Sequence, residues 1–571
     1  MWLSRLTRRT RFFLMLIFKL LAIIFLLFLF HSPIHAVYDP LSVPNNKYGI
    51  HVAELMDLPD AAALVNSNNG DWGYITLVIQ DGDKNTGKWQ EVFNTMRRLH
   101  LIPIIRLATH PEGDSWKIPQ TEDAKRWVNF LDALNWPTEN RYIILFNEPN
   151  HRKEWGNTIN PEEYADIALF YAKALKEKSQ DFFILPAGLD MSAISDGDAL
   201  EGSHYVERMY KAQPELLSII DGWTSHSYPN PGFSSSPYAT GKGTIASFQW
   251  ELKFLKDLGV TKNFPVFITE TGWIQRATGN NLALAASGVW TDSRIAAITP
   301  FLLNYQGSPF DNFSWKKLNS REFHPQYSLY QKITKIKGEP NQRESFTLAK
   351  ALFPNELVTN STYTLESEIT NTGQGILNSN DGYKTNIEGI PDGFTYFSDP
   401  LPLLEPSEKG LIRIHLKTPM EEGTYHLKTI LIHGNQHSTM EEKDVTLIPP
   451  PTLVIETQVG WKKEGEAHQV QILVYNQKDE LLHKFQDLTI KDGSVAISGL
   501  YNTVPGETYR IVVIIPYYLP RQTKVVLKNK KMEISMKRLL PLDLNNDGAL
   551  NILDLPALLF TKPHEVFGRF F

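Results

Sequence analysis

The chain has 571 residues, with 57 Lys and Arg against 63 Asp and Glu, so its formal charge is −6. At roughly 150 residues a domain, this length suggests about four domains. Hydrophobic residues at 42% and charged residues at 21% are values of a globular protein and exclude a wholly disordered or collagen-like chain. The acidity argues against a nucleic-acid partner, and the absence of cysteine excludes disulfides, thiolate metal sites and cysteine nucleophiles.

Residues 1–36 form the first predicted segment. They hold five basic residues and no acidic one, so the rest of the chain carries 52 basic against 63 acidic residues, a charge of −11. An apolar run over 12–30, interrupted by Lys19, is followed by a tolerable cleavage site at Ala36. This pattern is typical of a signal peptide or of an uncleaved membrane anchor, and it leaves both open. In either case we expect the body of the protein to be exported, secreted or tethered to the outer face of the cytoplasmic membrane.

Residues 45–337 alternate short apolar runs with amphipathic helical segments. One helix is predicted to begin at Asn160-Pro161, and another to run from Thr244 to Gly259. Repeated strand–helix units over this length favour a (β/α)8 TIM barrel. An open doubly wound sheet is the alternative, but no glycine-rich phosphate loop follows the first strand. The predicted strands, each an apolar run typical of burial on both faces, are 48–50, 74–79, 101–107, 142–146, 182–186, 222–226 and 264–269.

Residues 345–448 and 452–538 lose the helical rhythm and show short alternating strands punctuated by Gly, Asn and Pro. This pattern predicts an Ig-like β-sandwich and a second β-sandwich-like module, joined by the stiff linker Pro449-Pro450-Pro451. The two modules could bind carbohydrate or act as spacers, and no aromatic row on a strand face favours binding. A final segment, 540–571, carries a motif of its own.

Two carboxylates follow directly on predicted strands of the barrel. Glu148 lies in Asn147-Glu148-Pro149 after the strand at 142–146, and Glu270 follows the strand at 264–269. Because the C-terminal ends of barrel strands converge on the active face, these glutamates, on the fourth and seventh strands, are expected to face each other. Glycoside hydrolysis needs such a pair, with one carboxyl protonated to release the leaving group and the other ionised.

These motifs resemble those of clan A glycoside hydrolases, the cellulase-like retaining enzymes. Ser225-His226-Ser227-Tyr228 at the sixth strand and Phe313-Ser314-Trp315, placed at the eighth, fit the same pattern. The resemblance covers the barrel, about half the chain. It implies that Glu148 is the general acid/base and that Glu270 is the nucleophile.

The resemblance also implies a set of substrate-binding side chains. The asparagine before Glu148 is expected to bind the substrate 2-hydroxyl, the tyrosine to hold Glu270, and the histidine to line the same subsite. The two tryptophans are expected to offer stacking faces to a sugar ring. An arginine at the end of the third strand could keep Glu270 ionised, since an adjacent cation lowers a carboxyl pKa. These residues are Asn147, His226, Tyr228, Trp273, Trp315 and Arg106.

The C-terminal segment 540–571 contains an apparent calcium loop. Oxygen-bearing residues alternate along it, and Gly548 stands at the position of the sharp turn. This pattern suits calcium, because the ion needs six to eight oxygen ligands around one small loop. The motif resembles a dockerin repeat. A dockerin has two such loops and this chain shows one, so a calcium-clamped cap on the preceding module is as good an interpretation as binding of a cohesin-like partner. The expected ligands are Asp543, Asn545, Asp547, the Ala549 carbonyl, Asn551 and Asp554.

Two functions follow from these patterns. The first is an exported retaining glycoside hydrolase that cleaves O-glycosidic bonds of a polysaccharide or oligosaccharide by double displacement and needs no cofactor for catalysis. The second is a non-catalytic carbohydrate-binding or cell-surface adhesion protein built on a barrel scaffold. The presence of both glutamates favours the enzyme, because a binding protein has no need of both.

Overall fold

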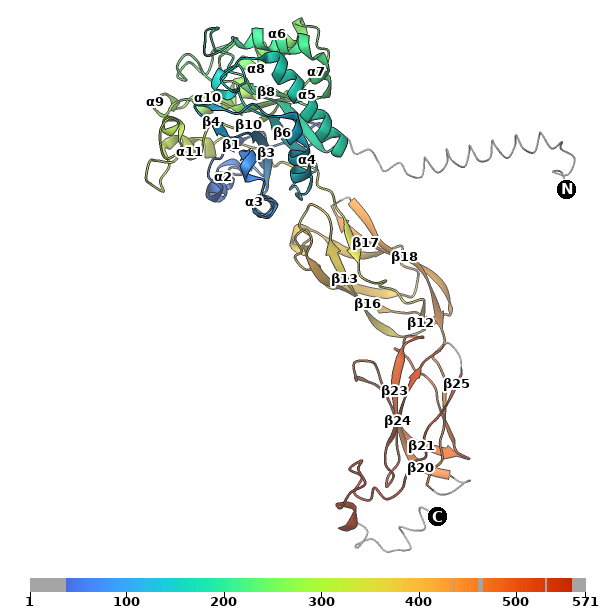
Figure 1. Cartoon of the computed structure of the whole chain (residues 1–571). Helices are drawn as coiled ribbons and strands as arrows, with labels where there is room; N and C mark the ends of the chain where they lie inside the picture. Colours follow the sequence, from blue (N-terminus) through green and yellow to red (C-terminus); the bar gives the residue numbers. More distant parts are fainter. Residues whose placement is uncertain (1–36, 435, 461–465, 529–530, 557–571) are drawn as a thin grey trace, which may run out of the picture. The chain divides into compact units, whose positions relative to one another are not determined.

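The computed structural model describes residues 37–434, 436–460, 466–528 and 531–556. The chain divides into two compact units, Met1–Glu344 and Ser345–Phe571, and the first is a mixed α/β unit (Figure 1). The predicted export segment 1–36 lies outside the described residues. Within the described ranges, no helix combines the length and the apolar character that crossing a bilayer requires.

The main strands of the first unit are parallel and form two sheets, in the orders β1-β2-β3-β6-β7 and β10-β9-β8. A short antiparallel pair, β4 (Pro111–Glu112) and β5 (Ser115–Trp116), lies outside them. All seven strands predicted for this unit are confirmed with small shifts at their ends. The parallel strands are β1 (Gly49–His51), β2 (Gly73–Gln80), β3 (Leu101–Ala108), β6 (Arg141–Leu145), β7 (Phe182–Pro186), β8 (Trp223–His226), β9 (Val266–Glu270) and β10 (Ile295–Ile298).

The two parallel sheets are linked at both of their edges. Tyr48 and Ile298 form an isolated parallel bridge between the ends of β1 and β10. On the other side, the backbone N–H of Asp221, just before β8, donates to the carbonyl of Ile184 in β7 at 2.8 Å. Side chains from six strands share one buried cluster, separate from the core under the helices, and its members include Tyr74, Ile104, Tyr142, Phe183, Phe267 and Ala296. Strands of both sheets therefore contribute to one shared cluster of buried side chains.

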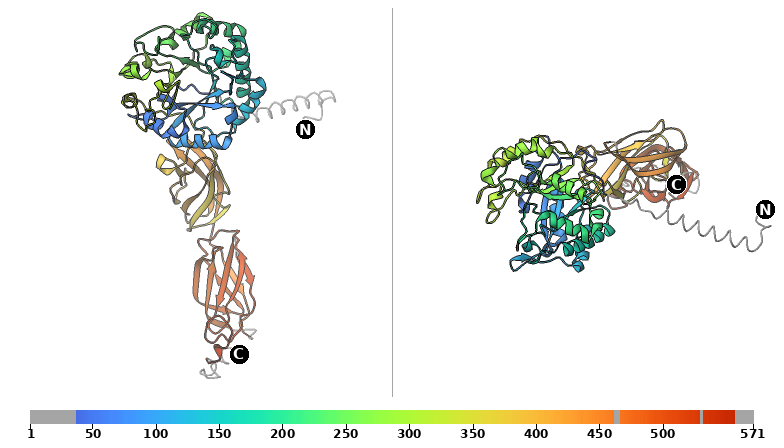
Figure 2. Two further views of the ribbon diagram at one scale, coloured as in Figure 1. Left: turned by 60° about the vertical axis from the view of Figure 1, so that its left-hand side comes forward. Right: turned by 90° about the horizontal axis from the view of Figure 1, so that it is seen from above.

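Helices cover the outer side of these strands, as the views in Figure 2 show. The side-chain oxygen of Asn160 caps α5 by accepting from the Glu163 N–H at 3.2 Å, which confirms the predicted start. Helix α8 begins later than predicted, because Thr244 forms a turn with Gly241 instead of a cap. The helices are α2 (Leu58–Val65), α3 (Thr86–Arg98), α4 (Ala124–Asp132), α5 (Pro161–Lys178), α6 (Gly202–Ala212), α7 (Pro214–Ile219), α8 (Ser247–Asp257), α9 (Gln275–Thr278), α10 (Asn281–Ser287) and α11 (Pro325–Gln331).

The eighth strand corrects one sequence-based placement. It is β10, and Phe313-Ser314-Trp315 comes well after it, at the end of a short 3-10 helix, η7 (Asp311–Phe313). The motif therefore does not sit at the end of the eighth strand. The strand itself gave little signal, because it is only four residues long and two of them are alanines.

The second unit consists almost entirely of β-strands. Its first part has two four-stranded sheets, in the orders β11-β13-β16-β15 and β12-β18-β17-β14, which share one apolar core. This is a sandwich. The strands are β11 (Phe346–Leu348), β12 (Glu356–Val358), β13 (Thr362–Asn371), β14 (Lys384–Glu388), β15 (Thr395–Ser398), β16 (Lys409–Lys417), β17 (Gly423–His433) and β18 (Gln436–Ile448).

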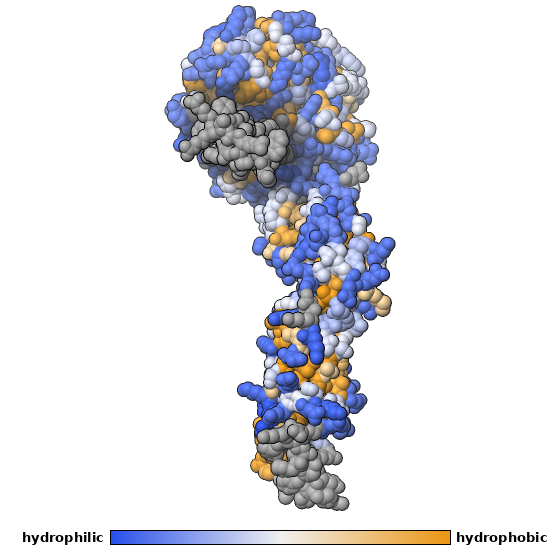
Figure 3. All heavy atoms as spheres, turned by 90° about the vertical axis from the view of Figure 1, so that its right-hand side faces the viewer, coloured by the Kyte–Doolittle hydropathy of each residue, from blue (hydrophilic) through white to orange (hydrophobic). Residues whose placement is uncertain are grey.

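The strands of the second part are connected into one seven-stranded sheet around a core of their own, and β21 and β22 are joined in it by the single pair Lys491–Ser494. Register shifts between β20 and β21 mark β-bulges, which increase the local bend and twist of the sheet, so that one face can wrap around a core. Its strands are β19 (Leu453–Glu456), β20 (Glu466–Tyr475), β21 (Leu481–Lys491), β22 (Ser494–Ile497), β23 (Thr508–Ile514), β24 (Arg521–Val526) and β25 (Met532–Ser535). On the face of the first unit drawn in Figure 3, hydrophilic side chains prevail.

Candidate active site

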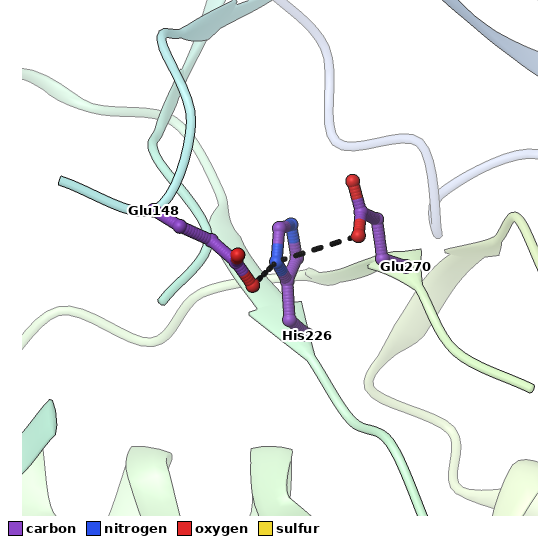
Figure 4. A group of neighbouring side chains, drawn as sticks. All are labelled: Glu148, His226 and Glu270. Atoms are coloured by element: carbon purple, nitrogen blue, oxygen red, sulfur yellow. Dashed lines mark hydrogen bonds and ion pairs between the residues drawn. The ribbon is translucent and has the colours of Figure 1, made fainter. Parts of the chain in front are cut away.

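Glu148, His226 and Glu270 converge at the C-terminal edge of the parallel strands (Figure 4). Glu270 is the last residue of β9, His226 the last of β8, and Glu148 comes shortly after β6. One carboxylate oxygen from each glutamate and one imidazole nitrogen all lie within 4.8 Å of one another. The structure thus brings together the two glutamates that the sequence singled out.

Glu270 is held as an anion by several donors. Nη1 of Arg106 donates to its Oε1 at 2.9 Å, and the Tyr228 hydroxyl donates to its Oε2 at 2.9 Å. Burial by itself raises the pKa of the Glu270 carboxyl, but the positive charges of His226 and Arg106 outweigh burial and leave that pKa below its ordinary value. Glu270 is therefore ionised at neutral pH, as a nucleophile must be.

Glu148 sits in a different environment. Its backbone has φ of +30°, an uncommon conformation for a residue with a side chain, and its N–H donates to the Gly188 carbonyl at 3.1 Å. In the described part of the chain, its carboxyl accepts a side-chain hydrogen bond from His226 alone, at 2.7 Å from Nδ1. The Glu148 side chain is also more exposed than that of Glu270, at 21% against 10%.

His226 lies between the two carboxyls, with Nδ1 also 3.8 Å from Oε2 of Glu270. Burial lowers the pKa of the imidazole, but the Glu270 charge and the hydrogen bond to Glu148 offset this, so the pKa of His226 lies above its ordinary value. Gly188, just after β7, makes room for the ring, since a Cβ at this position would stand 2.2 Å from Cδ2 of His226. A glycine is therefore required beside the histidine.

Asn147 lies between Arg106 and a third carboxylate, that of Glu154. Its Oδ1 accepts from Nη1 of Arg106 at 2.6 Å, and its Nδ2 donates to Oε2 of Glu154 at 3.3 Å. Burial raises the pKa of Glu154 to about 7, and the neighbouring charge of Glu148 adds to this. Glu154 was not singled out from the sequence, because no strand-end rule points to it.

The two tryptophans do not match their expected role. Trp273 and Trp315 are each only 3% exposed. The Trp273 indole N–H donates to the Ser235 carbonyl at 2.7 Å, and the Trp315 ring packs edge-on against Tyr330 at 5.2 Å. Both rings are thus occupied by packing, and neither presents an open face to a sugar in this structure.

A cavity of about 370 Å³ lies beside the carboxylates, with Arg106 in its wall. His51, the last residue of β1, was missed by sequence reasoning, although the strand-end rule that identified Glu270 applies to it equally. A second cavity, of about 30 Å³, lies on the side of Asn147 and Glu154. The larger cavity is lined by His51, Val52, Ala53, Leu55, Leu77, Val78, Gln80, Asp83, Lys88, Trp89, Arg106, Trp116, Phe301, Leu302, Tyr305 and Phe310.

The spacing of Glu148, His226 and Glu270 could also hold a metal ion. Two features argue against this. The Arg106 guanidinium already places a positive charge on Glu270, at 2.9 Å. The raised pKa of His226 favours the protonated ring, whereas a metal ligand has to be the neutral imidazole. The group is better matched to proton transfer and nucleophilic attack than to metal binding.

The predicted calcium loop is folded around two buried carboxylates. Asp543 accepts from the N–H groups of Asp547 and Gly548, at 3.1 and 3.0 Å, and Asp554 accepts from those of Leu544 and Asn551, each at 2.8 Å. Burial raises the pKa of Asp543, and the charges of Asp554 and Asp547 act in the same direction. A bound cation would relieve this repulsion, and the oxygen donors of the loop are of the type that calcium takes.

The loop is also tied to the module before it. The N–H of Tyr517 donates to Oδ1 of Asn546 at 2.6 Å, and Tyr518 forms an isolated bridge with Pro541. Leu542 and Leu544 pack against the core of the seven-stranded sheet. The loop therefore packs directly on that module.

No protein-family model matches the sequence, and no curated protein sequence does. Similar solved structures include an endo-β-1,4-glucanase from Xanthomonas axonopodis pv. citri, 14% identical over 51% of this chain and 99% of that chain, with a TM-score of 0.38. A family 39 glycoside hydrolase from Bacteroides cellulosilyticus WH2 is 12% identical over 66% of this chain and 82% of that one, with a TM-score of 0.36. An endo-1,4-β-mannanase from Eisenia fetida is 13% identical over 47% and 87%, with a TM-score of 0.32. At such values, function has to be inferred from the side chains of the site.

Proposed function

We propose that the protein is an exported retaining glycoside hydrolase that cleaves O-glycosidic bonds of a polysaccharide or oligosaccharide. The observation that carries the proposal is the approach of the Glu148 and Glu270 carboxylate oxygens to within 4.8 Å of each other. Retaining enzymes hold their carboxyl groups about 5–5.5 Å apart, whereas inverting enzymes need about 6.5–9.5 Å to admit a water molecule. The short separation favours double displacement.

The surroundings of the two carboxyls support different roles for them. Glu270 accepts from Arg106 and Tyr228 and has a lowered pKa, so it attacks the anomeric carbon as the nucleophile and forms the glycosyl-enzyme. Glu148, with fewer donors, gives its proton to the leaving oxygen and then takes one from the water that releases the sugar. His226, which contacts both, keeps the charge of the pair balanced as the proton moves.

The same interpretation includes a closed (β/α)8 barrel. Its support is the bridge between Tyr48 and Ile298, the bond between Asp221 and Ile184, and the interior cluster shared by six strands. In such a barrel the active face lies at the C-terminal ends of the strands, which is where the glutamates stand.

The remaining parts of the chain have supporting roles in the proposal. Residues 1–36 direct export, on the evidence of their basic and apolar pattern. The two β modules act as spacers, and calcium clamps the loop at 543–554 as a cap on the second module. Binding of a cohesin-like partner is the alternative for this loop.

The test is hydrolysis by the full chain on a panel of polysaccharides and oligosaccharides, with the anomeric form of the first product followed by NMR. We expect Glu270→Gln to lower kcat by more than about 10³-fold and Glu148→Gln by about 10²–10⁴-fold, without loss of fold. The matched control is Glu162→Gln, a half-exposed glutamate at the start of α5, and it should leave kcat unchanged.

An inverted product would refute the retaining mechanism. If the wild-type chain binds glycans of this panel but cleaves none, the second candidate applies, a carbohydrate-binding or adhesion protein on the same scaffold.

A further inference from the structure

The 370 Å³ cavity next to Glu270 has the properties of a ligand site. Its volume lies near the lower end of the roughly 300–1,000 Å³ of small-molecule pockets, which is room for one or two sugar rings. Neither Glu148 nor Glu270 is among its walls, but Arg106 lines it and contacts Glu270 directly. Through Arg106, the cavity adjoins Glu270, the proposed nucleophile.

His51 contributes a buried polar atom that lacks a partner. His51 lines the cavity and is 3% exposed. Among the described residues, its buried Nδ1 atom has no hydrogen-bond partner. Such an atom costs free energy unless a ligand or water completes its hydrogen bond. Burial and the nearby Arg106 charge lower the pKa of His51 to about 3, so the ring is neutral and can bond a hydroxyl.

The charges in the cavity wall are already compensated. Arg106 pairs with Glu270 at 2.9 Å, and Lys88 pairs with Asp83 at 2.6 Å. Neither cation is left to balance the carboxylate of an acidic sugar, and a buried unpaired charge is expensive. An uncharged ring is the better match.

Aromatic rings form one side of the same cavity. The Phe301 ring contacts His51 edge-on at 5.1 Å and Phe310 at 5.3 Å, and Tyr305 lies 5.4 Å from Phe310. Phe310 is 40% exposed, so part of its face is open. These rings, and not Trp273 or Trp315, offer apolar surface to the C–H face of a pyranose.

We propose that this cavity binds the neutral sugar residues on the nonreducing side of the scissile bond, with Nδ1 of His51 hydrogen-bonded to a sugar hydroxyl. The assignment of the cavity to the nonreducing side of the sugar chain rests on the proposed function. The preference of the cavity for neutral over acidic sugars does not depend on it. His51 acts here as a specificity-determining residue.

The experiment measures binding without turnover, in full-length protein carrying Glu148→Gln, a residue outside the cavity wall. The probes are cellobiose, mannobiose and digalacturonic acid, titrated by calorimetry. We expect at least one neutral disaccharide to bind and the acidic one to bind at least ten-fold more weakly. Equal or tighter binding of digalacturonic acid, or binding of none of the three, would overturn the proposal.

Two matched pairs of variants test the residues. His51→Leu should weaken binding of the neutral disaccharide about ten-fold. His51→Asn, of similar size but with an amide near the position of Nδ1, should bind it with an affinity within about three-fold of the parent's. Phe310→Ala should weaken binding several-fold, with Phe170→Ala, an exposed ring on α5, as control.

If the His51 variants lose their fold by circular dichroism, the Phe310 pair decides, because Phe310 is partly exposed. Equal affinities of His51→Leu and His51→Asn, or of the two phenylalanine variants, would contradict the assignment. If the protein cleaves no glycan but shows the expected binding, this inference stands and the proposed function is refuted. If the protein cleaves glycans and His51→Leu leaves KM unchanged, the proposed function stands and this inference is refuted.

Discussion

Replacement of Glu154 by glutamine tests the electrostatics of the site through its effect on stability. The pKa of this carboxyl is raised from 4.5 to about 7, first by burial and then by the charge of Glu148. As the pH rises, the unfolded chain therefore loses this proton before the folded chain does. The contribution of Glu154 to stability is fully present below about pH 4.5 and is lost as the pH rises through 7.

The size of the effect follows from the shift. A rise of about 2.5 pKa units, the difference between 4.5 and about 7, corresponds to about 3 kcal/mol. Glutamine cannot ionise, and its carbonyl can still accept from Asn147. At pH 8, Glu154→Gln should therefore be more stable than wild type by up to about 3 kcal/mol. For a unit of this size, with an unfolding entropy of about 2.1 cal/mol/K per residue, Tm should rise by about 5 °C.

The assay is thermal unfolding followed by tryptophan fluorescence between pH 4 and 8. All but one of the 13 Trp residues lie in Met1–Glu344, so the signal reports the unit that contains Glu154. The control is Glu162→Gln, because the bond from Arg208 lowers the pKa of Glu162 and the variant should not gain stability at high pH. If the Tm difference between wild type and Glu154→Gln does not change with pH, Glu154 is not a buried, proton-holding carboxyl.

Two further predictions concern the glycine beside His226 and the C-terminal loop. Gly188→Ala should displace the His226 ring, because the added Cβ would lie 2.2 Å from Cδ2, and kcat should fall at least ten-fold; unchanged kcat with an unmoved imidazole NMR signal would refute this. Calcium should raise the melting temperature of the second module, and Asp543→Asn should reduce that rise; no shift with millimolar calcium would remove the proposed clamp.

The strand-end rule explains which parts of the site could be predicted. Glu148 and Glu270 follow long, nearly continuous apolar runs, so both the strand and the position of its end were visible in the sequence. The same rule applies to His51, which directly follows the predicted strand at 48–50 but was not singled out. Glu154 lies in a 3-10 turn, η5 (Arg152–Glu154), and its proximity to Asn147 depends on how the loop folds back.

The wrong placement of Trp315 has a different cause. Trp315 was assigned to the end of the eighth strand by the resemblance, and the short alanine-containing β10, which precedes it, went unnoticed. The segment after β10 does supply aromatic residues to the cavity, but they are Phe301, Tyr305 and Phe310. Which ring of such a segment faces the ligand depends on packing, here of Trp315 against Tyr330, and no local pattern encodes it.

Arg106 connects these observations. Its Nη1 lies 2.9 Å from Glu270 and 2.6 Å from Oδ1 of Asn147, and the side chain forms part of the walls of both cavities. A planar guanidinium can contact two acceptors in fixed directions, whereas a lysine ammonium would act as a movable point charge. The same charge keeps Glu270 ionised, orients the Asn147 amide toward Glu154, and helps to hold His51 neutral. Because this cation is already paired, we expect the adjacent cavity to prefer uncharged sugars, while Glu270 stays ionised for the nucleophilic role proposed for it.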